Sequence, residues 1–305
     1  MSRQQRDALD AVLRSLPRSE VPPTLEEQRS GFAAAVSRPA PEGVVTRRTV
    51  LGGRPALELE PADASGHLLY LHGGGYIVGS PDTHAGLVGE LARRAGLRAT
   101  SVDYRLAPEH PFPAAVDDGL AAYRELLEST DPRDLVMAGD SAGGGLSIAT
   151  LLAAREAGLP QPAAVVVFSP WVDLTLSGAS IRAKEGADPI FTEADVRAYA
   201  DLYVGAGDRA HPLASPVFAD LTGLPPLLVQ AGANELLLDD AVRLAGRAGA
   251  DGVEVTLEVA PGLPHVFQHH YGRLDEADAA LDRAARFLTA HQPRTAGGRR
   301  AERSA

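Results

Sequence analysis

The chain has 305 residues, 45% of them hydrophobic and 23% charged, and a formal net charge of −11. This length and apolar content can form one large α/β domain or two small ones. The acidic balance argues against nucleic acid or an anionic membrane as the main partner, because both require a basic surface. The chain has no cysteine, which excludes disulfides, thiolate chemistry and cysteine-ligated zinc.

The two ends of the sequence carry no obvious targeting signal. The first ten residues lack the apolar core of a signal peptide. No run approaches the ~18 apolar residues of a membrane span. We therefore expect a cytoplasmic protein without a membrane span. Residues 292–305 are rich in Arg, Gly, Ser and Ala, and we expect a disordered tail there.

Residues 1–40 are predicted to form two helices. Apolar residues recur at helical spacing from Ala8 to Leu16, and Pro22 and Pro23 then interrupt the pattern. Thr24 and Glu27 form a capping box for a second helix that reaches Val36.

Strands and helices alternate after this segment. The predicted strands occupy 44–51, 56–60, 67–71, 98–103, 135–138, 163–169, 227–231 and 253–259, and the first two are joined by a glycine pair typical of a hairpin. The predicted helices occupy 83–95, 114–127, 146–157, 238–248 and 275–289. This order predicts an eight-stranded, mostly parallel sheet with helices on both faces.

Residues 172–220 interrupt the alternation. Thr192 and Asp195 are predicted to cap a helix that runs to Val204. Together with residues 1–40, this insertion is expected to form a helical cap over the carboxyl ends of the strands. The core is then expected to comprise residues 41–171 and 221–291.

The segment 135–145 reads Leu-Val-Met-Ala-Gly-Asp-Ser-Ala-Gly-Gly-Gly. A strand, a tight turn flanked by Gly139 and Gly143, and a helix put Ser141 on the G-x-S-x-G nucleophile elbow. Side chains at the two glycines would collide with neighbouring elements in so sharp a turn. The alternative is a phosphate-binding loop, but no Lys follows the glycines and the dinucleotide-binding spacing is absent.

The third predicted strand leads directly into His72-Gly73-Gly74-Gly75-Tyr76. Glycines allow backbone N–H groups to approach a ligand oxygen closely. In acyl transfer such groups stabilise the tetrahedral oxyanion. A flexible loop is the alternative interpretation.

These two motifs resemble those of the hormone-sensitive-lipase-like (bacterial group IV) branch of α/β-hydrolase carboxylesterases. Residues 103–114, Asp-Tyr-Arg-Leu-Ala-Pro-Glu-His-Pro-Phe-Pro-Ala, match the same family almost without interruption. The resemblance covers about residues 40–290 and implies an α/β-hydrolase fold with a helical cap. It also implies the chain order Ser, acid, His for the catalytic triad, and an oxyanion hole made by the N–H groups of Gly74, Gly75 and Ala142.

The general base is expected after the last strand, where the chain reads Pro-Gly-Leu-Pro-His-Val-Phe over residues 261–267. His265 fits the Pro-His-x-Phe pattern of the family. His269 and His270 are weaker candidates, and the alternative is that they belong to one face of a helix start. His72 is expected to orient its own loop.

The acid is expected after the seventh strand, where residues 232–240 read Gly-Ala-Asn-Glu-Leu-Leu-Leu-Asp-Asp. Many relatives carry Asp-Pro-Leu-x-Asp-Glu here, so Glu235 departs from the usual Asp. A Glu can still hold the imidazole tautomer and stabilise the imidazolium. Asp239 and Asp240 are expected in the first turn of the next helix, near its positive end.

Four residues are candidates for the substrate pocket: Tyr76, Asp140, Trp171 and Leu236. Core packing is the alternative for Trp171, and Asp140 is otherwise expected to pair with backbone in its turn. No His, Asp or Glu spacing predicts a metal site, and no cofactor is expected.

The sequence therefore predicts a cofactor-free serine carboxylesterase with Ser141, Glu235 and His265 as the triad, and the family resemblance implies short-chain esters as substrates. Hydrolysis of a lactone or secondary-metabolite ester, or acyl transfer, would use the same site. A non-catalytic ligand receptor, like the plant gibberellin receptors, is disfavoured because all three triad residues are present. The family resemblance also implies that an exposed eighth strand at the sheet edge could pair in a homodimer.

Overall fold

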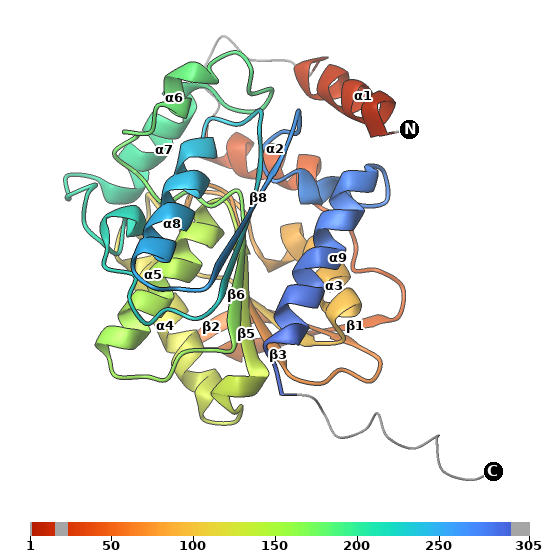
Figure 1. Cartoon of the computed structure of the whole chain (residues 1–305), viewed down its shortest axis with the longest axis vertical. Coiled ribbons are helices and arrows are strands. Elements are labelled where there is room, and N and C mark those ends of the chain that lie inside the picture. The colour runs from red at the N-terminus through yellow and green to blue at the C-terminus, as the bar shows by residue number, and fades with distance from the viewer. Residues whose placement is uncertain (1, 16–23, 294–305) are drawn as a thin grey trace.

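One sheet of eight strands organises the computed structural model, which describes residues 2–15 and 24–293. The strand order is β1-β2-β4-β3-β5-β6-β7-β8 (Figure 1). β2 is antiparallel to β1 and β4, and the remaining neighbours are parallel. The strands are β1 (Val44–Leu51), β2 (Arg54–Pro61), β3 (His67–Leu71), β4 (Arg98–Val102), β5 (Leu135–Asp140), β6 (Ala164–Phe168), β7 (Leu227–Gly232) and β8 (Val255–Ala260). The predicted eight-stranded, mostly parallel sheet is confirmed.

The opening hairpin follows from its two glycines. Leu51 pairs with Arg54, so Gly52 and Gly53 alone form the turn. Their φ angles are 62° and 72°. Two consecutive positive φ values are the geometry of the tight turns that match the twist of a hairpin, and glycine adopts them without a steric penalty.

Helices cover both faces of the sheet (Figure 1). α3 (Pro81–Ala95) and α9 (Asp275–Ala290) lie on one face. α4 (Ala114–Leu127), α5 (Ala142–Glu156) and α8 (Leu238–Ala250) lie on the other. The side chains of β5 alternate between two cores, because successive residues of a strand point to opposite faces. Met137 packs in the core beneath α4, α5 and α8, whereas Val136 and Ala138 pack in the core beneath α3 and α9.

Helix α5 begins four residues earlier than predicted. The expectation was a start at Leu146, after the glycines, but the helix begins at Ala142. Gly143, Gly144 and Gly145 are therefore helical despite the low helix propensity of glycine. Tertiary crowding explains this choice, since a Cβ on Gly143 would lie 2.0 Å from the carbonyl oxygen of Leu71.

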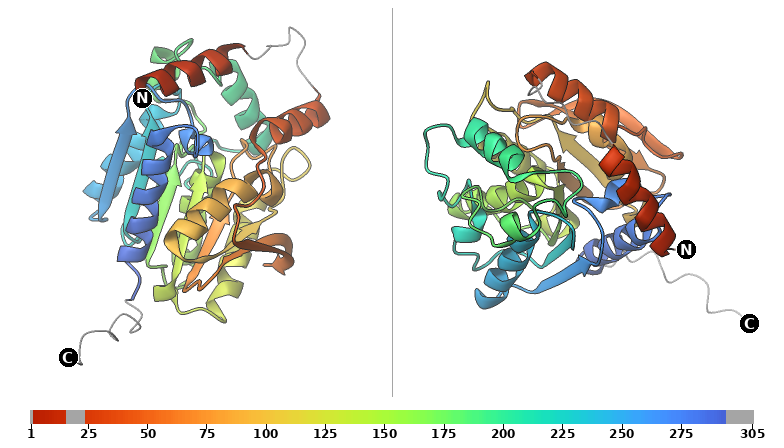
Figure 2. Two further views of the ribbon diagram at one scale, coloured as in Figure 1. Left: turned by 90° about the vertical axis from the view of Figure 1, so that its right-hand side faces the viewer. Right: turned by 90° about the horizontal axis from the view of Figure 1, so that it is seen from above.

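The remaining helices gather at one end of the molecule, the upper end in Figure 1, as the side view in Figure 2 also shows. They are α1 (Ser2–Ser15), α2 (Leu25–Val36), α6 (Ser180–Ala183) and α7 (Glu193–Val204). The predicted capping boxes of α2 and α7 are both present, at Thr24 and Thr192. Several side chains of α1 contact the rest of the chain: Arg6 donates to the carbonyl oxygen of Pro261 (3.0 Å), and Arg14 donates to that of Ala187 (2.8 Å).

Two further expectations concern the chain ends and the sheet edge. Pro22, Pro23 and residues 294–305 of the expected tail lie outside the described residues. Among the helices formed by residues 2–15 and 24–293, none combines the length and apolarity needed to cross a membrane. β8 is an edge strand, and Leu257 and Val259 are 38% and 40% exposed on it.

Candidate active site

Ser141 is the single residue between β5 and α5. Its φ of 52° and ψ of −123° lie in a region that side-chain-bearing residues rarely adopt. Its N–H donates to Phe168 O (2.8 Å), and its carbonyl accepts from the N–H groups of Gly145 (3.1 Å) and Trp171 (2.9 Å). These contacts hold the strained turn, and the strain brings the side chain to the carboxyl edge of the sheet.

The glycines around Ser141 are required by close backbone contacts. A Cβ on Gly139 would lie 2.3 Å from Gly143 O, and one on Gly143 would lie 2.0 Å from Leu71 O. Neither carbonyl oxygen can move without displacing a strand or a helix. The G-x-S-x-G spacing is thus a packing requirement of the turn that carries Ser141.

The loop after β3 is held at its first two residues. Gly73 N–H donates to Asp140 Oδ1 (3.0 Å), and His72 Nδ1 donates to Gly73 O (2.8 Å). Tyr104 Oη donates to His72 O (2.7 Å), and the His72 and Tyr104 rings stack with centroids 4.2 Å apart. Burial lowers the pKa of His72 to about 3, so its ring is neutral at ordinary pH. His72 therefore orients its loop, as expected.

The next residues of this loop leave their N–H groups available. Gly74 and Gly75 have φ values of 120° and 59°. A Cβ on Gly74 would lie 2.2 Å from Val78 O. Within the described part of the chain, the N–H groups of Gly74, Gly75 and Ala142 donate no hydrogen bond. Backbone donors left free beside a nucleophile are what an oxyanion hole requires.

His265 and Glu235 lie together at the ends of β8 and β7. His265 Nδ1 is 3.5 Å from Glu235 Oε2, and both side chains are buried. Both ring nitrogens of His265 and Glu235 Oε1 are buried, and none of these atoms has a hydrogen-bond partner among the described residues, so the 3.5 Å contact is longer than a hydrogen bond. Burial lowers the pKa of His265, but the adjacent Glu235 carboxylate outweighs it and raises that pKa above its usual value.

Ser169 supports this pair, and no sequence motif marks it. Its hydroxyl donates to Glu235 Oε2 (2.7 Å) and accepts from the N–H of Val266 (3.0 Å). Ser169 has a φ of 45°, directly after β6. One hydroxyl thus connects the acid to the residue that follows His265.

The other two acidic candidates are engaged elsewhere. Asp239 and Asp240 lie in the first turn of α8, as expected. Asp239 Oδ2 accepts from Ser180 N–H (2.9 Å), and Asp240 Oδ2 accepts from Val172 N–H (2.9 Å). The structure therefore brings Glu235, and neither aspartate, to His265.

The four pocket candidates are buried, with different contacts. Tyr76 stacks on Tyr203 with centroids 3.7 Å apart, and the centroid of Trp171 lies 6.2 Å from that of Tyr76. Leu236 is fully buried. The carboxylate of Asp140 accepts hydrogen bonds from Gly73 N–H and Tyr70 Oη, and the pairing with backbone agrees with its position in the turn.

Two aromatic residues of the 172–220 insertion lie beside the site, and the sequence offered no pattern that identified them. The Phe191 ring meets the His265 imidazole edge-on, with centroids 5.3 Å apart. Tyr199 packs against Gly75, where an added Cβ would lie 2.4 Å from Tyr199 Cδ2.

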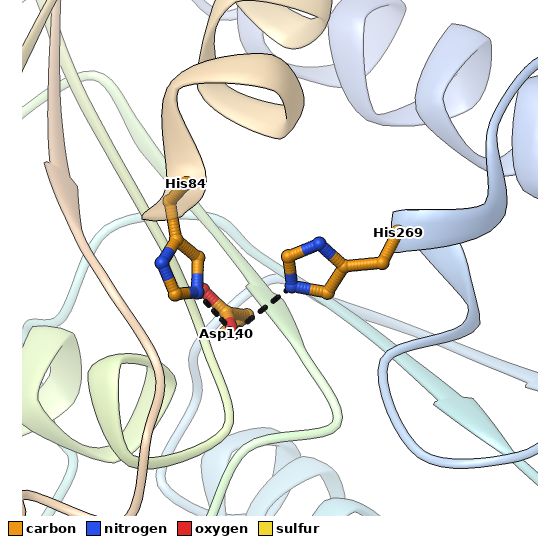
Figure 3. Close-up of side chains that lie close together, drawn as sticks. All are labelled: His84, Asp140 and His269. Carbon is orange, nitrogen blue, oxygen red and sulfur yellow. Dashed lines mark hydrogen bonds and ion pairs between the residues drawn. The ribbon is translucent and has the colours of Figure 1, made fainter. Parts of the chain in front are cut away.

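A buried cluster of His84, Asp140 and His269 lies behind the loop (Figure 3). One potential ligand atom from each residue lies within 4.8 Å of the others, although no sequence spacing predicted such a group. His84 Nε2 lies 3.3 Å and His269 Nε2 3.9 Å from Asp140 Oδ2, and a metal would compete for the same atoms. Burial raises the pKa of Asp140, but the two histidines outweigh it and hold that pKa well below its usual range.

Comparisons with known proteins agree with this geometry. A family profile described as an alpha/beta hydrolase fold matches residues 68–269. An acetyl-hydrolase of Streptomyces hygroscopicus is 47% identical over 232 residues, which cover 75% of this chain and 78% of that protein. An esterase of Acinetobacter venetianus is 36% identical over 233 residues, 75% of this chain and 76% of that protein.

Solved structures extend the similarity to nearly the whole chain. The crystal structure of an esterase from the bacterial hormone-sensitive lipase (HSL) family is 42% identical and superposes with a TM-score of 0.90, covering 95% of this chain and 99% of that one. The chain therefore belongs to the bacterial hormone-sensitive-lipase family of α/β-hydrolase-fold esterases and is a carboxylic-ester hydrolase.

Proposed function

We propose that this hydrolase cleaves short-chain carboxylic esters through an acyl-enzyme formed on Ser141. Ser141 Oγ attacks the ester carbonyl carbon while His265 Nε2 takes the hydroxyl proton. The carbonyl electron pair moves to oxygen, and the N–H groups of Gly74, Gly75 and Ala142 stabilise the resulting oxyanion.

The second half of the reaction uses the same base. His265 gives its proton to the departing alkoxide, then deprotonates a water molecule that attacks the acyl-enzyme and releases the acid. Glu235 holds the Nδ1–H tautomer and stabilises the imidazolium. The observation that carries this assignment is the buried His265, whose Nδ1 faces Glu235 at 3.5 Å while Nε2 is unpartnered among the described residues. Catalytic hydrogen bonds that are long in a free enzyme tighten when substrate binds.

We also propose that α1, α2 and the 172–220 insertion act as the cap that bounds the substrate. Phe191 and Tyr199 of the insertion lie against His265 and Gly75, which leaves little room for a long acyl chain. The name of the Streptomyces relative, an acetyl-hydrolase, supports a small acyl group. Hydrolysis of a lactone or secondary-metabolite ester, or transfer of the acyl group to an alcohol, would use the same acyl-enzyme.

The test is the turnover of p-nitrophenyl acetate by Ser141→Ala. Loss of a triad serine costs on the order of a million-fold in kcat in other triads, and the same scale is expected here. Ser129→Ala, in the turn after α4, is the control and should keep wild-type turnover. Wild-type turnover by Ser141→Ala would exclude the proposed mechanism. Product analysis with and without an added alcohol distinguishes hydrolysis from acyl transfer.

A further inference from the structure

The Asp140 carboxylate receives contacts from three separate segments of the chain: β3 with the loop after it, α3, and the segment 267–270. Oδ1 accepts from Gly73 N–H (3.0 Å) and from Tyr70 Oη (2.8 Å). Oδ2 lies 3.3 Å from His84 Nε2 and 3.9 Å from His269 Nε2 (Figure 3). An ionised carboxylate only accepts hydrogen bonds, so His84 donates to it through Nε2–H, whereas His269 at 3.9 Å makes an electrostatic contact and no hydrogen bond.

The position of Asp140 connects the two halves of the proposed oxyanion hole. Asp140 directly precedes Ser141 and Ala142 in the chain, so it belongs to the half that the elbow contributes. Its bond to Gly73 reaches the residue before Gly74, which begins the other half. A Cβ on Gly73 would lie 2.1 Å from Asp140 Oδ2, so the two segments are in close contact. The orientation of the Asp140 side chain therefore influences the distance between two sets of backbone N–H donors, one after β3 and one after β5.

His84 and His269 set that direction. His84 lies at the start of α3, and its Nδ1 is 2.8 Å from Thr83 Oγ1. His269 belongs to the short helix η3 (Phe267–His270), four residues after His265. The two rings meet edge-on with centroids 5.1 Å apart. The segment that carries the base is thus tied to the same carboxylate as the oxyanion loop.

We infer that Asp140, oriented by His84 and His269, is a positioning residue that sets the distance between the two halves of the oxyanion hole. This inference rests on the proposed function of Ser141 and the three backbone donors. Asp140 touches none of the reacting groups. Its effect is to hold Gly74 and Gly75 where the oxyanion forms, so its loss weakens transition-state binding more than ground-state binding.

Asp140→Asn and two matched pairs of histidine variants test the inference. Asn keeps one oxygen for Gly73 and Tyr70 but places an N–H₂ group toward His84, where only an acceptor fits. His269→Leu removes the Nε2 group that faces Asp140, whereas the amide nitrogen of His269→Gln reaches a similar point and restores a polar contact. His84→Leu and His84→Gln form the second pair. The control is His270→Gln, whose ring belongs to the same short helix but not to the cluster.

We expect kcat for p-nitrophenyl acetate to fall at least about tenfold in Asp140→Asn and in both Leu variants, with KM within about threefold. This is less than the roughly 100-fold to 1000-fold loss that removal of an oxyanion donor causes. Both Gln variants should recover most of kcat. His270→Gln should match the wild type.

A trifluoromethyl ketone supplies a readout that a merely structural role would not change. Ser141 Oγ adds to its carbonyl carbon, the hydroxyl proton passes to His265, and the ketone oxygen becomes an oxyanion in the hole. Its inhibition constant should rise in proportion to the loss in kcat across the variants. A proportional change in the inhibition constant and in kcat indicates loss of oxyanion stabilisation, because the bound inhibitor carries an oxyanion in the hole. KM reports mainly the ground state.

Three results would overturn the inference: kcat within about twofold of wild type in Asp140→Asn and both Leu variants, an unchanged inhibition constant, or Gln variants no better than Leu variants. If Asp140→Asn does not fold, the comparison of His269→Leu with His269→Gln tests the inference instead. The His269 side chain is 15% exposed and is therefore better able to accept a substitution. Ser141→Ala distinguishes failure of the proposed function from failure of the inference on Asp140. Activity in Ser141→Ala refutes the proposed function, whereas inactivity there with unimpaired cluster variants refutes this inference alone.

Discussion

Asp188 accepts a 2.9 Å hydrogen bond from the N–H of Leu236, the residue that follows Glu235. Asp188 belongs to the 172–220 insertion, is 2% exposed, and also accepts from the N–H of Phe191 (3.0 Å). Ser180 of the same insertion donates to the carbonyl oxygen of Leu236 (2.6 Å). The N–H and carbonyl groups of Leu236, next to the proposed triad acid, are therefore both held by the insertion, so the folding of the insertion affects the geometry of Glu235.

Asp188→Ala should lower both stability and activity. The substitution leaves the N–H groups of Leu236 and Phe191 without their acceptor. Loss of a buried acceptor of this kind costs about 2–3 kcal/mol in the free energy of unfolding. We also expect kcat to fall about tenfold, because a small misplacement of a catalytic group is costly. Urea unfolding and p-nitrophenyl acetate kinetics measure the two effects.

The control for Asp188→Ala is Asp208→Ala, an exposed aspartate in the same insertion that bonds only locally, to Ala210 N–H. It should leave kcat unchanged. An Asp188→Ala protein with wild-type stability and kcat would show that these hydrogen bonds do not support the triad.

Glu235→Gln and Asp239→Asn should differ sharply in activity. Glu235 faces His265, whereas Asp239 accepts from the backbone of Ser180. Replacing a triad acid with its amide stabilises the wrong imidazole tautomer and costs on the order of 10,000-fold in kcat in a related triad. Asp239→Asn should be mild. The opposite ranking in kcat would assign the acid role to Asp239.

The pH profile of kcat/KM should report the raised pKa of His265. Burial lowers this pKa, but the adjacent Glu235 carboxylate raises it by more. Only the neutral imidazole can act as the base, so activity should be lost as the pH falls through this raised pKa. Glu235→Gln removes the negative charge and should move the acidic limb of its residual activity to lower pH. An acidic limb that does not move would mean that another group controls it.

Phe191→Ala should broaden the range of acyl chains. The Phe191 ring lies against His265, and its removal opens space beside the reacting carbonyl. The ratio of kcat/KM for p-nitrophenyl octanoate to that for the acetate should rise about tenfold, since each buried methylene is worth about 0.8 kcal/mol. Phe218→Ala, at a ring that is 38% exposed, is the control. An unchanged ratio in Phe191→Ala would show that other residues limit chain length.

The sheet could be predicted because its signals are local. Apolar runs such as β5 and β6 are buried on both faces, and the Gly52-Gly53 turn specifies a hairpin by backbone geometry alone. The start of α5 could not be predicted, because the glycines at 143–145 are set by the neighbouring strand and loop rather than by helix propensity. Local rules identify elements, whereas tertiary contacts fix their ends.

The same distinction applies to the site. Gly-rich motifs and chain order pointed to Ser141, Gly74 and His265. Ser169 and His84 could not be predicted, because their partners are distant in sequence and no spacing marks them. Ser169 reaches an acid 66 residues away, and His84 reaches a carboxylate 56 residues away. Such contacts exist only once strands β3, β5, β6 and β7 lie side by side.

Covalent labelling tests the central claim most directly, namely that Ser141 is the nucleophile. The protein is treated with diethyl p-nitrophenyl phosphate, digested, and the modified peptide is located by mass spectrometry. A single diethylphosphoryl group on Ser141, formed as activity is lost, is the predicted result. A label on a different residue that accounts for the loss of activity, with Ser141 unmodified, would contradict the account.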